Sequence, residues 1–251
     1  MQVFISGVAG FLGSHLTERF LALGHRVLGN DNLIGGDKHN VPKGVEFSSA
    51  DCTDKRRIDQ LLKDVDLVYH CACYPHEGLS MFSPRIITRS VYDASLVMMT
   101  AAIKNKVKRF VFCSSMARYG AQQTPFTEDM TPQPVDPYGI AKVAVEQTLK
   151  VLAQTHGMEY VIAVPHNIYG PRQRYTDPFR NVASIMINLM KQGRQPTVYG
   201  DGNQVRCFSY IDDVVEPLVK MGLQPGLSGE IINIGPDTGE VTINELVQII
   251  R

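Results

Sequence analysis

The sequence predicts an α/β fold, a doubly wound parallel sheet followed by a smaller, irregular lobe at its C-terminal side. Short runs of β-branched and aromatic residues alternate with longer amphipathic segments through the first half of the chain. A glycine-rich turn directly follows the first of these runs. Beyond Pro165 the alternation ends, and Gly-Pro and Asp-Pro pairs separate shorter elements. The regular part therefore forms the sheet and the irregular part the lobe.

The elements of the sheet follow from two kinds of pattern. Six apolar runs predict strands, at Val3–Ser6, Arg26–Gly29, Val45–Ser48, Leu67–Cys71, Arg109–Ser114 and Tyr160–Val164. Between them, apolar residues at three- and four-residue spacing predict the crossover helices Phe11–Leu23, Lys55–Leu62, Pro84–Lys104 and Tyr138–Gln154. We expect at least six strands, in a first domain of residues 1–165.

Residues 166–251 are predicted to form the second domain, a substrate lobe. It contains one clear helical pattern, from about Phe179 to Gln192. The last residues, Thr242–Arg251, begin another helical pattern and stop without a C-terminal cap. This predicts that the natural chain continues beyond Arg251.

Composition excludes several classes of protein. The chain has 251 residues, of which 44% are hydrophobic, so disordered and fibrous structures are excluded. Lys and Arg number 25 and Asp and Glu also 25, with no block of like charge, which argues against nucleic acid as a partner. No apolar run approaches the roughly 18–20 residues of a membrane span, and no secretion signal is visible, so we expect a cytoplasmic protein.

The five cysteines are odd in number and lack Cys-x-x-Cys spacing, which predicts reduced thiols rather than disulfides. The run His70-Cys71-x-Cys73 resembles a metal-binding pattern. Alternate strand residues point to opposite faces, which would place His70 away from both cysteines. We therefore predict no metal site.

The glycine-rich turn predicts a dinucleotide site. Gly7, Gly10 and Gly13 lie between a strand and a helix, the arrangement of the Rossmann fingerprint. The first glycine permits the tight turn, the second lets the backbone approach a diphosphate, and the third allows close packing of helix on strand. The N–H groups at the helix start, around Phe11 and Leu12, would bind the diphosphate.

Two acidic residues extend this site. Asp31 follows the second strand, where a carboxylate binds the adenosine ribose hydroxyls, and Asp51 follows the third, where it suits an adenine contact. A 2′-phosphate beside Asp31 would bring like charges together, so NAD is favoured over NADP. NADP stays the alternative, because the basic side chains of Arg26 and Lys38 would attract its 2′-phosphate.

Further motifs lie at the other end of the predicted site. Ser114 and Ser115 end the fifth strand, while Tyr138 and Lys142 are four residues apart and share one helix face. With these motifs the chain resembles the extended short-chain dehydrogenase/reductase family, particularly its nucleotide-sugar epimerases and dehydratases such as UDP-glucose 4-epimerase. The resemblance covers essentially the whole chain and includes Asp31-Asn-Leu33, Tyr119-Gly120, His166-Asn-Ile-Tyr-Gly-Pro171 and Gly200-Asp-Gly-Asn-Gln-Val-Arg206.

The resemblance implies the roles of the catalytic residues. Tyr138 would be the base, Lys142 its activating cation, and Ser115 a proton bridge to the reacting hydroxyl. Lowering a tyrosine pKa by three units takes about 4 kcal/mol, and a cation ~6 Å away at an effective dielectric of ~20 supplies about 2.8 kcal/mol. We therefore expect Lys142, aided by the positive nicotinamide ring, to activate Tyr138.

The resemblance also implies ligand contacts and an oligomeric state. NAD would be bound by Gly7, Gly10, Phe11, Leu12, Gly13, Asp31, Asn32, Asp51, Cys52, Cys71, Ala72, Tyr138 and Lys142. A nucleotide-diphospho-sugar would be bound by Ser115, Tyr138, Asn167, Asn181, Val182 and Arg206. The family pairs the helices near residues 84–104 and 138–154 into a homodimer, and Val91, Leu96, Met98, Met99, Val143, Val145 and Leu149 would supply apolar surface for it.

The residues after Ser115 bear on the reaction. Dehydratases of the family place Asp-Glu there and decarboxylases a Glu, whereas this chain has Met116-Ala117. Because neither side chain transfers a proton, we predict epimerisation at C4 through a 4-keto sugar. Dehydration of the 4,6- or 5,6-type, as in antibiotic pathways, stays the alternative, and a non-catalytic NAD sensor a remote one. His76, Glu77 and Cys113 lie where the chain departs from the family pattern, and they are candidates for contacts to an unusual substrate, with their individual roles left open.

Overall fold

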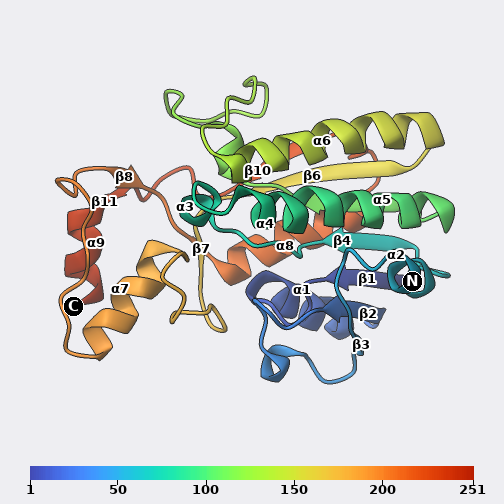
Figure 1. The fold of residues 1–251 in the computed structure, drawn as a ribbon, viewed down its shortest axis with the longest axis horizontal. Coiled ribbons are helices and arrows are strands. Elements are labelled where there is room, and N and C mark those ends of the chain that lie inside the picture. Colours follow the sequence, from blue (N-terminus) through green and yellow to red (C-terminus); the bar gives the residue numbers. More distant parts are fainter.

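The computed structural model describes residues 1–251, and its centre is one seven-stranded sheet (Figure 1). The strands are all parallel and lie in the order β10-β6-β5-β4-β1-β2-β3. Their bounds are β1 Gln2–Ser6, β2 Arg26–Asp31, β3 Glu46–Ser49, β4 Leu67–His70, β5 Arg109–Cys113, β6 Glu159–Pro165 and β10 Ile231–Ile234. The predicted doubly wound sheet is confirmed: the six strands expected from the sequence end within two residues of their predicted bounds, and β10 is an additional, seventh strand.

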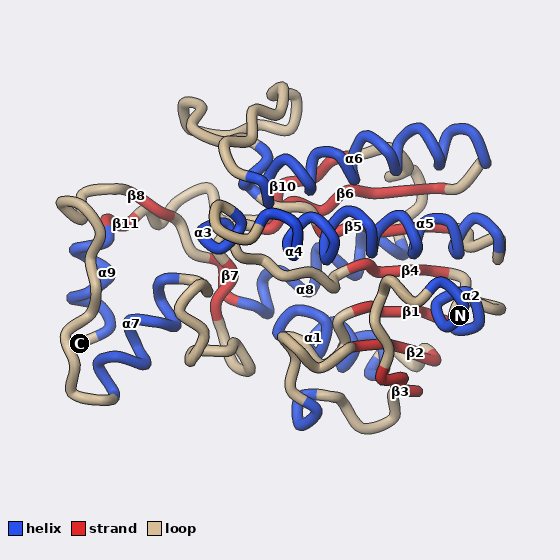
Figure 2. The backbone as a smooth tube through the Cα atoms, in the orientation of Figure 1, coloured by secondary structure: helices blue, strands red, loops and turns tan.

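Helices cover both faces of the sheet (Figure 2). One face carries α1 Phe11–Ala22 and α8 Ile211–Leu223, and the other α2 Lys55–Leu61, α5 Ala94–Lys104 and α6 Pro137–His156. Alternate residues of β1 enter different cores: Phe4 joins a cluster of 27 buried residues, and Val3 and Ile5 join one of 18. Two-residue alternation along the strand thus produces the two-sided packing.

The predicted helix over Pro84–Lys104 forms as a continuous stretch with a local irregularity. It consists of α4 Pro84–Thr88, a π-helical turn at Arg89–Asp93, and α5. The expectation that no apolar run reaches membrane-spanning length was wrong for this stretch, which by length and composition alone is long and apolar enough. Half of it is buried against α2, α6 and the sheet, as in the core helix of a globular fold.

The smaller lobe lies beyond the carboxyl ends of the central strands, at the left of Figure 1. It contains α7 Val182–Lys191, α9 Ile243–Ile250 and the paired short strands β8 Val205–Arg206 and β11 Val241–Thr242. A second short pair, β7 Ile168–Tyr169 and β9 Ser209–Tyr210, links it to the sheet. Only five buried residues form its apolar cluster: Ala183, Met186, Ile243, Leu246 and Val247.

The caps of the lobe helices explain where they begin. α7 begins at Val182, three residues later than predicted, because the Asn181 side chain accepts a hydrogen bond from the Ala183 N–H at 2.9 Å. α9 begins with a capping box in which Thr242 and Glu245 satisfy each other's backbone N–H groups.

Two elements from beyond residue 165 return to the sheet. α8 packs against α1, and β10 pairs with β6 as the seventh strand. The Arg109 guanidinium donates hydrogen bonds to the carbonyls at the end of α8, those of Met221, Gly222 and Gln224, at 3.0, 3.1 and 2.7 Å. The sequence analysis included residues 211–234 in the second domain, and the structure places both elements against the sheet. The boundary at residue 165 stays a prediction.

Candidate active site

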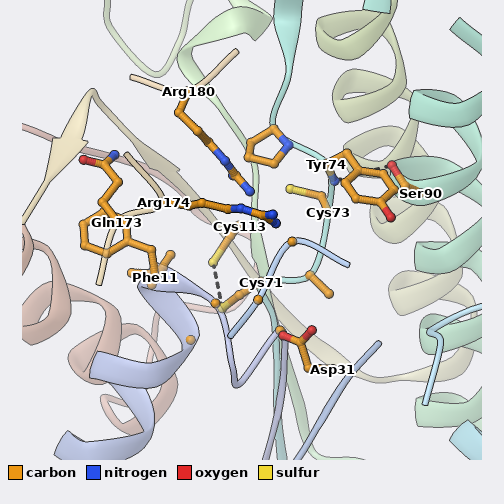
Figure 3. Close-up of a pocket in the computed structure, with 18 of the residues that line it drawn as sticks. Phe11, Asp31, Cys71, Cys73, Tyr74, Ser90, Cys113, Gln173, Arg174 and Arg180 are labelled. Carbon is orange, nitrogen blue, oxygen red and sulfur yellow. Dashed lines mark hydrogen bonds between the residues drawn. The ribbon is translucent and has the colours of Figure 1, made fainter. Parts of the chain in front are cut away.

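A cavity of about 1640 Å³ opens between the carboxyl ends of the central strands and the smaller lobe (Figure 3). It is lined by the glycine-rich turn, by the residues after β2, β4 and β5, by the start of α6 and by the segment before α7. Open parallel sheets bind ligands at this edge. All the predicted cofactor and substrate residues line the cavity except Arg206.

Two glycines make the first turn possible. Gly7 has φ +77°, and a Cβ there would lie 3.1 Å from the backbone of Ala72. A Cβ on Gly13 would lie 2.1 Å from the Gly7 carbonyl oxygen, so α1 could not approach the turn with any other residue. Gly10 caps α1 without a side-chain hydrogen bond. The first-turn N–H groups of α1 therefore remain available to an anion at the cavity wall.

The Asp31 carboxylate is held in place beside this turn. It accepts hydrogen bonds from the N–H groups of Ala9 and Leu33 at 3.2 and 2.8 Å, and the residue is 7% exposed. Burial raises the pKa of Asp31, and the two N–H groups oppose the rise. Gly36 lies against the carboxylate, since a Cβ there would be 2.8 Å from Oδ2. The carboxylate is thus oriented before a ligand binds.

Asp51, after β3, lies next to Asn32, after β2. The Asn32 amide and the Thr53 N–H donate to its carboxylate, both at 2.8 Å. Burial raises the pKa of Asp51, but these hydrogen bonds outweigh burial and hold the pKa below its usual value. The neighbouring Cys52 thiol is buried, which raises its pKa to about 12.

At the other end of the cavity the structure brings Tyr138, Lys142 and Ser115 together. Asp136 caps α6 by accepting from the Gly139 N–H at 2.9 Å, and this fixes Tyr138 in the first turn. The Lys142 Nζ donates to the Cys113 carbonyl at 2.6 Å and lies 5.7 Å from the centre of the Tyr138 ring. Tyr138 and Lys142 are 4% and 2% exposed, so both side chains are fixed by packing.

The environment of Tyr138 favours its neutral form. Burial raises the pKa of its hydroxyl well above 10, and the Cys73 thiol and the Glu77 carboxyl add to the rise. The Ser115 hydroxyl opposes it through a hydrogen bond. The protein alone thus holds Tyr138 neutral, and the activation of Tyr138 by Lys142 together with the nicotinamide ring stays a prediction.

A buried network that sequence reasoning missed supports the turn carrying Ser115. Arg118 and Glu146 form an ion pair at 3.2 Å and are 2% and 5% exposed. Ser114 also donates to Glu146, and the Ser115 hydroxyl accepts from the Ala117 N–H at 3.2 Å. The ion pair joins the Met116–Arg118 turn to the middle of α6, so Ser115 and Tyr138 are positioned by one network.

Three cysteines and a histidine surround the end of β4. The Sγ atoms of Cys71 and Cys113 are 3.5 Å apart, and all five cysteines of the chain are free thiols (Figure 3). His70 lies between the hydroxyls of Ser6 and Ser95 at 2.7 and 2.9 Å. Burial and the Lys142 charge lower the pKa of His70 to about 3.

The predicted substrate residues of the smaller lobe are distributed unevenly. Asn167, Asn181 and Val182 line the cavity, whereas Arg206 lies on exposed β8 and donates to the adjacent Val205 carbonyl at 2.7 Å. Sequence reasoning did not single out other residues that line it from both halves: Tyr74, Arg89, Arg172, Gln173, Arg174 and Arg180.

Known proteins are similar to this chain in sequence and in fold. The family model described as the NAD dependent epimerase/dehydratase family matches residues 3–235. The chain belongs to this family. It is 36% identical to a protein of Methanocaldococcus jannaschii provisionally named UDP-glucose 4-epimerase, an alignment covering 100% of this chain and 81% of that one. It is 32% identical to the UDP-N-acetyl-alpha-D-glucosaminuronate decarboxylase of Bacillus cytotoxicus, covering 100% and 79%.

Two solved structures are also similar throughout. UDP-glucose 4-epimerase of Thermotoga maritima, solved with UDP-glucose, superposes with a TM-score of 0.94 at 30% identity, covering 100% of this chain and 81% of that one. UDP-glucose 4-epimerase of Thermus thermophilus, solved with NAD, gives a TM-score of 0.92 at 30% identity, covering 100% and 82%. The chain is an NAD-dependent nucleotide-sugar enzyme.

The residues of this cavity fit NAD. The first-turn N–H groups of α1 suit its diphosphate, and the fixed Asp31 carboxylate suits the ribose hydroxyls of its adenosine. The buried Tyr138 and Lys142 lie at the opposite end of the same cavity. One dinucleotide extended along the cavity would contact both ends.

Proposed function

We propose that this enzyme epimerises a UDP-hexose, or its N-acetyl or uronic relative, at C4 through a 4-keto sugar. The observation that carries the proposal is the set Ser115, Tyr138 and Lys142 at one end of the cavity, with Met116-Ala117 after the serine. Epimerisation at C4 needs one proton acceptor that also returns the proton. It does not need a second acid–base pair.

In the proposed reaction Tyr138 acts in its ionised form, and its phenolate oxygen accepts the proton of the C4 hydroxyl, with the Ser115 hydroxyl as the bridge. NAD, when bound, supplies reversible hydride chemistry at C4. The 4-keto sugar then presents its opposite face, and Tyr138 returns the proton to the C4 oxygen as the C4–H bond re-forms. Lys142 holds a positive charge beside the tyrosine, which stabilises its ionised form.

Dehydration is the second candidate, because Glu77 places a carboxyl in the same cavity. Glu77 begins the short helix α3 Glu77–Ser80, and its charge acts on Tyr138. Burial raises the pKa of Glu77, the nearby Asp136 adds to the rise, and Arg206 opposes it. A carboxyl with a raised pKa suits proton transfer to a leaving hydroxyl.

Deuterated water separates the two reactions. The enzyme is incubated with NAD and a panel of UDP-, GDP- and dTDP-hexoses in deuterated water, and the products are analysed by NMR and mass spectrometry. We expect a UDP-hexose and its C4 epimer of unchanged mass, with the proton at C5 retained. Loss of one water, or deuterium at C5 or C6, would contradict epimerisation and favour a reaction in which Glu77 takes part.

We also propose a homodimer through α4, α5 and α6. The surface predicted for it is partly unavailable, because five of the seven residues are buried within the single chain: Val91, Met98, Met99, Val145 and Leu149. Other apolar side chains of these helices are exposed, Ile86 and Ile140 at 56% and Val151 at 62%. Light scattering at micromolar protein should give a dimer mass, and a monomer would refute the proposal.

A further inference from the structure

The segment Pro171–Asn181 crosses from the smaller lobe to the sheet half and contacts the loop after β2. The Arg174 Nη1 donates to the Ile34 carbonyl at 2.7 Å. A Cβ on Gly35 would lie 3.3 Å from the Arg180 Nη2. Ile34 and Gly35 follow Asp31 in the chain. The segment therefore forms a wall of the cavity at its Asp31 end.

The arginines of this segment differ in how their charges are balanced. Arg172 pairs with Glu18 at 2.6 Å. Arg180 pairs with Asp177 at 3.1 Å, but the same carboxylate oxygen also contacts His76 at 2.9 Å. Arg174 forms no salt bridge, and a carbonyl oxygen is its hydrogen-bond partner. Arg174 thus has no carboxylate in direct contact, although its charge reaches Asp37, and Arg180 shares the carboxylate of Asp177 with His76.

Both guanidinium groups are directed into the cavity, and in Figure 3 their ends lie near Cys73 and Cys113, with Cys71, and Phe11 at the start of α1, below them. The wall on that side carries the positive end of α1, with its unpaired N–H groups. Two positive walls that face one cavity favour an anion between them. A diphosphate supplies two negative charges and oxygens that guanidinium groups bind bidentately.

We propose that Arg174 and Arg180 bind the diphosphate of NAD from the smaller lobe, opposite the N-terminus of α1. Both the cofactor and a nucleotide-sugar contain a diphosphate, so the chemistry alone does not distinguish them. The contacts of the two arginines with Ile34 and Gly35, in the loop that follows Asp31, favour the cofactor. The smaller lobe then contributes to cofactor retention as well as to substrate binding.

The test measures binding by the cofactor-free full chain, without turnover. The variants are Arg174→Gln and Arg180→Gln, with Arg194→Gln as control, since Arg194 is an exposed arginine just beyond α7. Calorimetry is run with NAD, with ADP-ribose, which keeps the diphosphate, with adenosine, which lacks it, and with UDP. Circular dichroism checks that each variant is folded.

We expect Arg174→Gln to weaken the binding of NAD and of ADP-ribose by about tenfold to a hundredfold, the effect of losing a hydrogen bond to a charged group. Arg180→Gln should weaken them less, and adenosine and UDP should bind as before. A loss of UDP affinity with NAD affinity unchanged would overturn the proposal and assign the arginines to the substrate diphosphate. The proposal would also be overturned if Arg174→Gln bound NAD as tightly as the control variant Arg194→Gln does.

Discussion

The site residues of the sheet half are buried on large apolar clusters, whereas those of the smaller lobe are more exposed and rest on a small cluster. Asp31, Tyr138 and Lys142 are at most 7% exposed and rest on clusters of 27 and 18 buried residues. Arg174 and Arg206 are exposed, and the lobe that carries them has a cluster of five. Elements with few buried apolar contacts open at low cost in free energy. The groups proposed for chemistry are thus fixed in advance, while those proposed for ligand capture can adjust.

Replacing Tyr138 with Phe tests the fixed half most directly and has the largest expected effect. The substitution removes the ionisable oxygen and keeps the buried ring, so turnover should fall at least the 10²–10⁴-fold typical of lost acid–base catalysis. NAD and UDP affinities, measured by calorimetry, should stay within about twofold because the packing is preserved. A variant that retains most of its activity would remove Tyr138 from the mechanism.

Two leucine-to-alanine substitutions, one in each apolar cluster, compare how much the sheet half and the lobe contribute to stability. Leu149 is 0% exposed in the large cluster, and Leu246 is 7% exposed in the lobe cluster. Leu149→Ala should lower the free energy of global unfolding by about 2–5 kcal/mol. Leu246→Ala should mainly open the lobe, which hydrogen exchange would report as faster exchange in α7 and α9 only. Equal losses of global stability in urea would show that lobe and sheet unfold as one unit.

Sequence reasoning was most accurate where local pattern alone determines structure. The Gly7–Gly13 turn needs only a strand, three glycines and a helix, and Tyr138 and Lys142 need only four-residue spacing. Both arrangements form as predicted. Their geometry is set by backbone rules that act over a few residues.

Features that depend on distant residues were not predicted. Arg118 and Glu146 are 28 positions apart, and neither looks buried from its own neighbourhood. α8 contains Pro217, which normally argues against a helix, and the four-residue β10 gains its place by pairing with β6. The path of Pro171–Asn181 over the cavity has no periodic pattern. In each case tertiary packing decides the structure.

The assignment of Asp31 is tested by cofactor choice. Its carboxylate would accept hydrogen bonds from the ribose hydroxyls of NAD and repel a 2′-phosphate, so NAD should bind much more tightly than NADP. Asp31→Ala should weaken NAD binding by about tenfold to a hundredfold and reduce the difference between the affinities for NAD and NADP. Calorimetry with both cofactors measures it. Equal affinities in the unmodified protein would contradict the assignment.

His70 gives the smallest expected effect, a pH dependence of stability in the fixed half. Its folded pKa is about 3, lowered by burial and by the Lys142 charge from a reference value of 6.5. Below about pH 6.5 the unfolded chain binds a proton at this residue that the folded protein does not. The free energy of unfolding therefore falls as pH decreases, by up to about 1.4 kcal/mol per pH unit from this group.

The variant His70→Gln removes this titration, with His156→Gln as the control, an exposed histidine at the end of α6. Urea unfolding is measured between pH 7 and pH 5, and the slope of stability against pH is compared rather than its absolute value. Losing the contacts to Ser6 and Ser95 destabilises His70→Gln at every pH, but only loss of the titration flattens its slope. A slope equal to that of His156→Gln would mean that the His70 site admits a proton, so this part of the fixed half would be open to water.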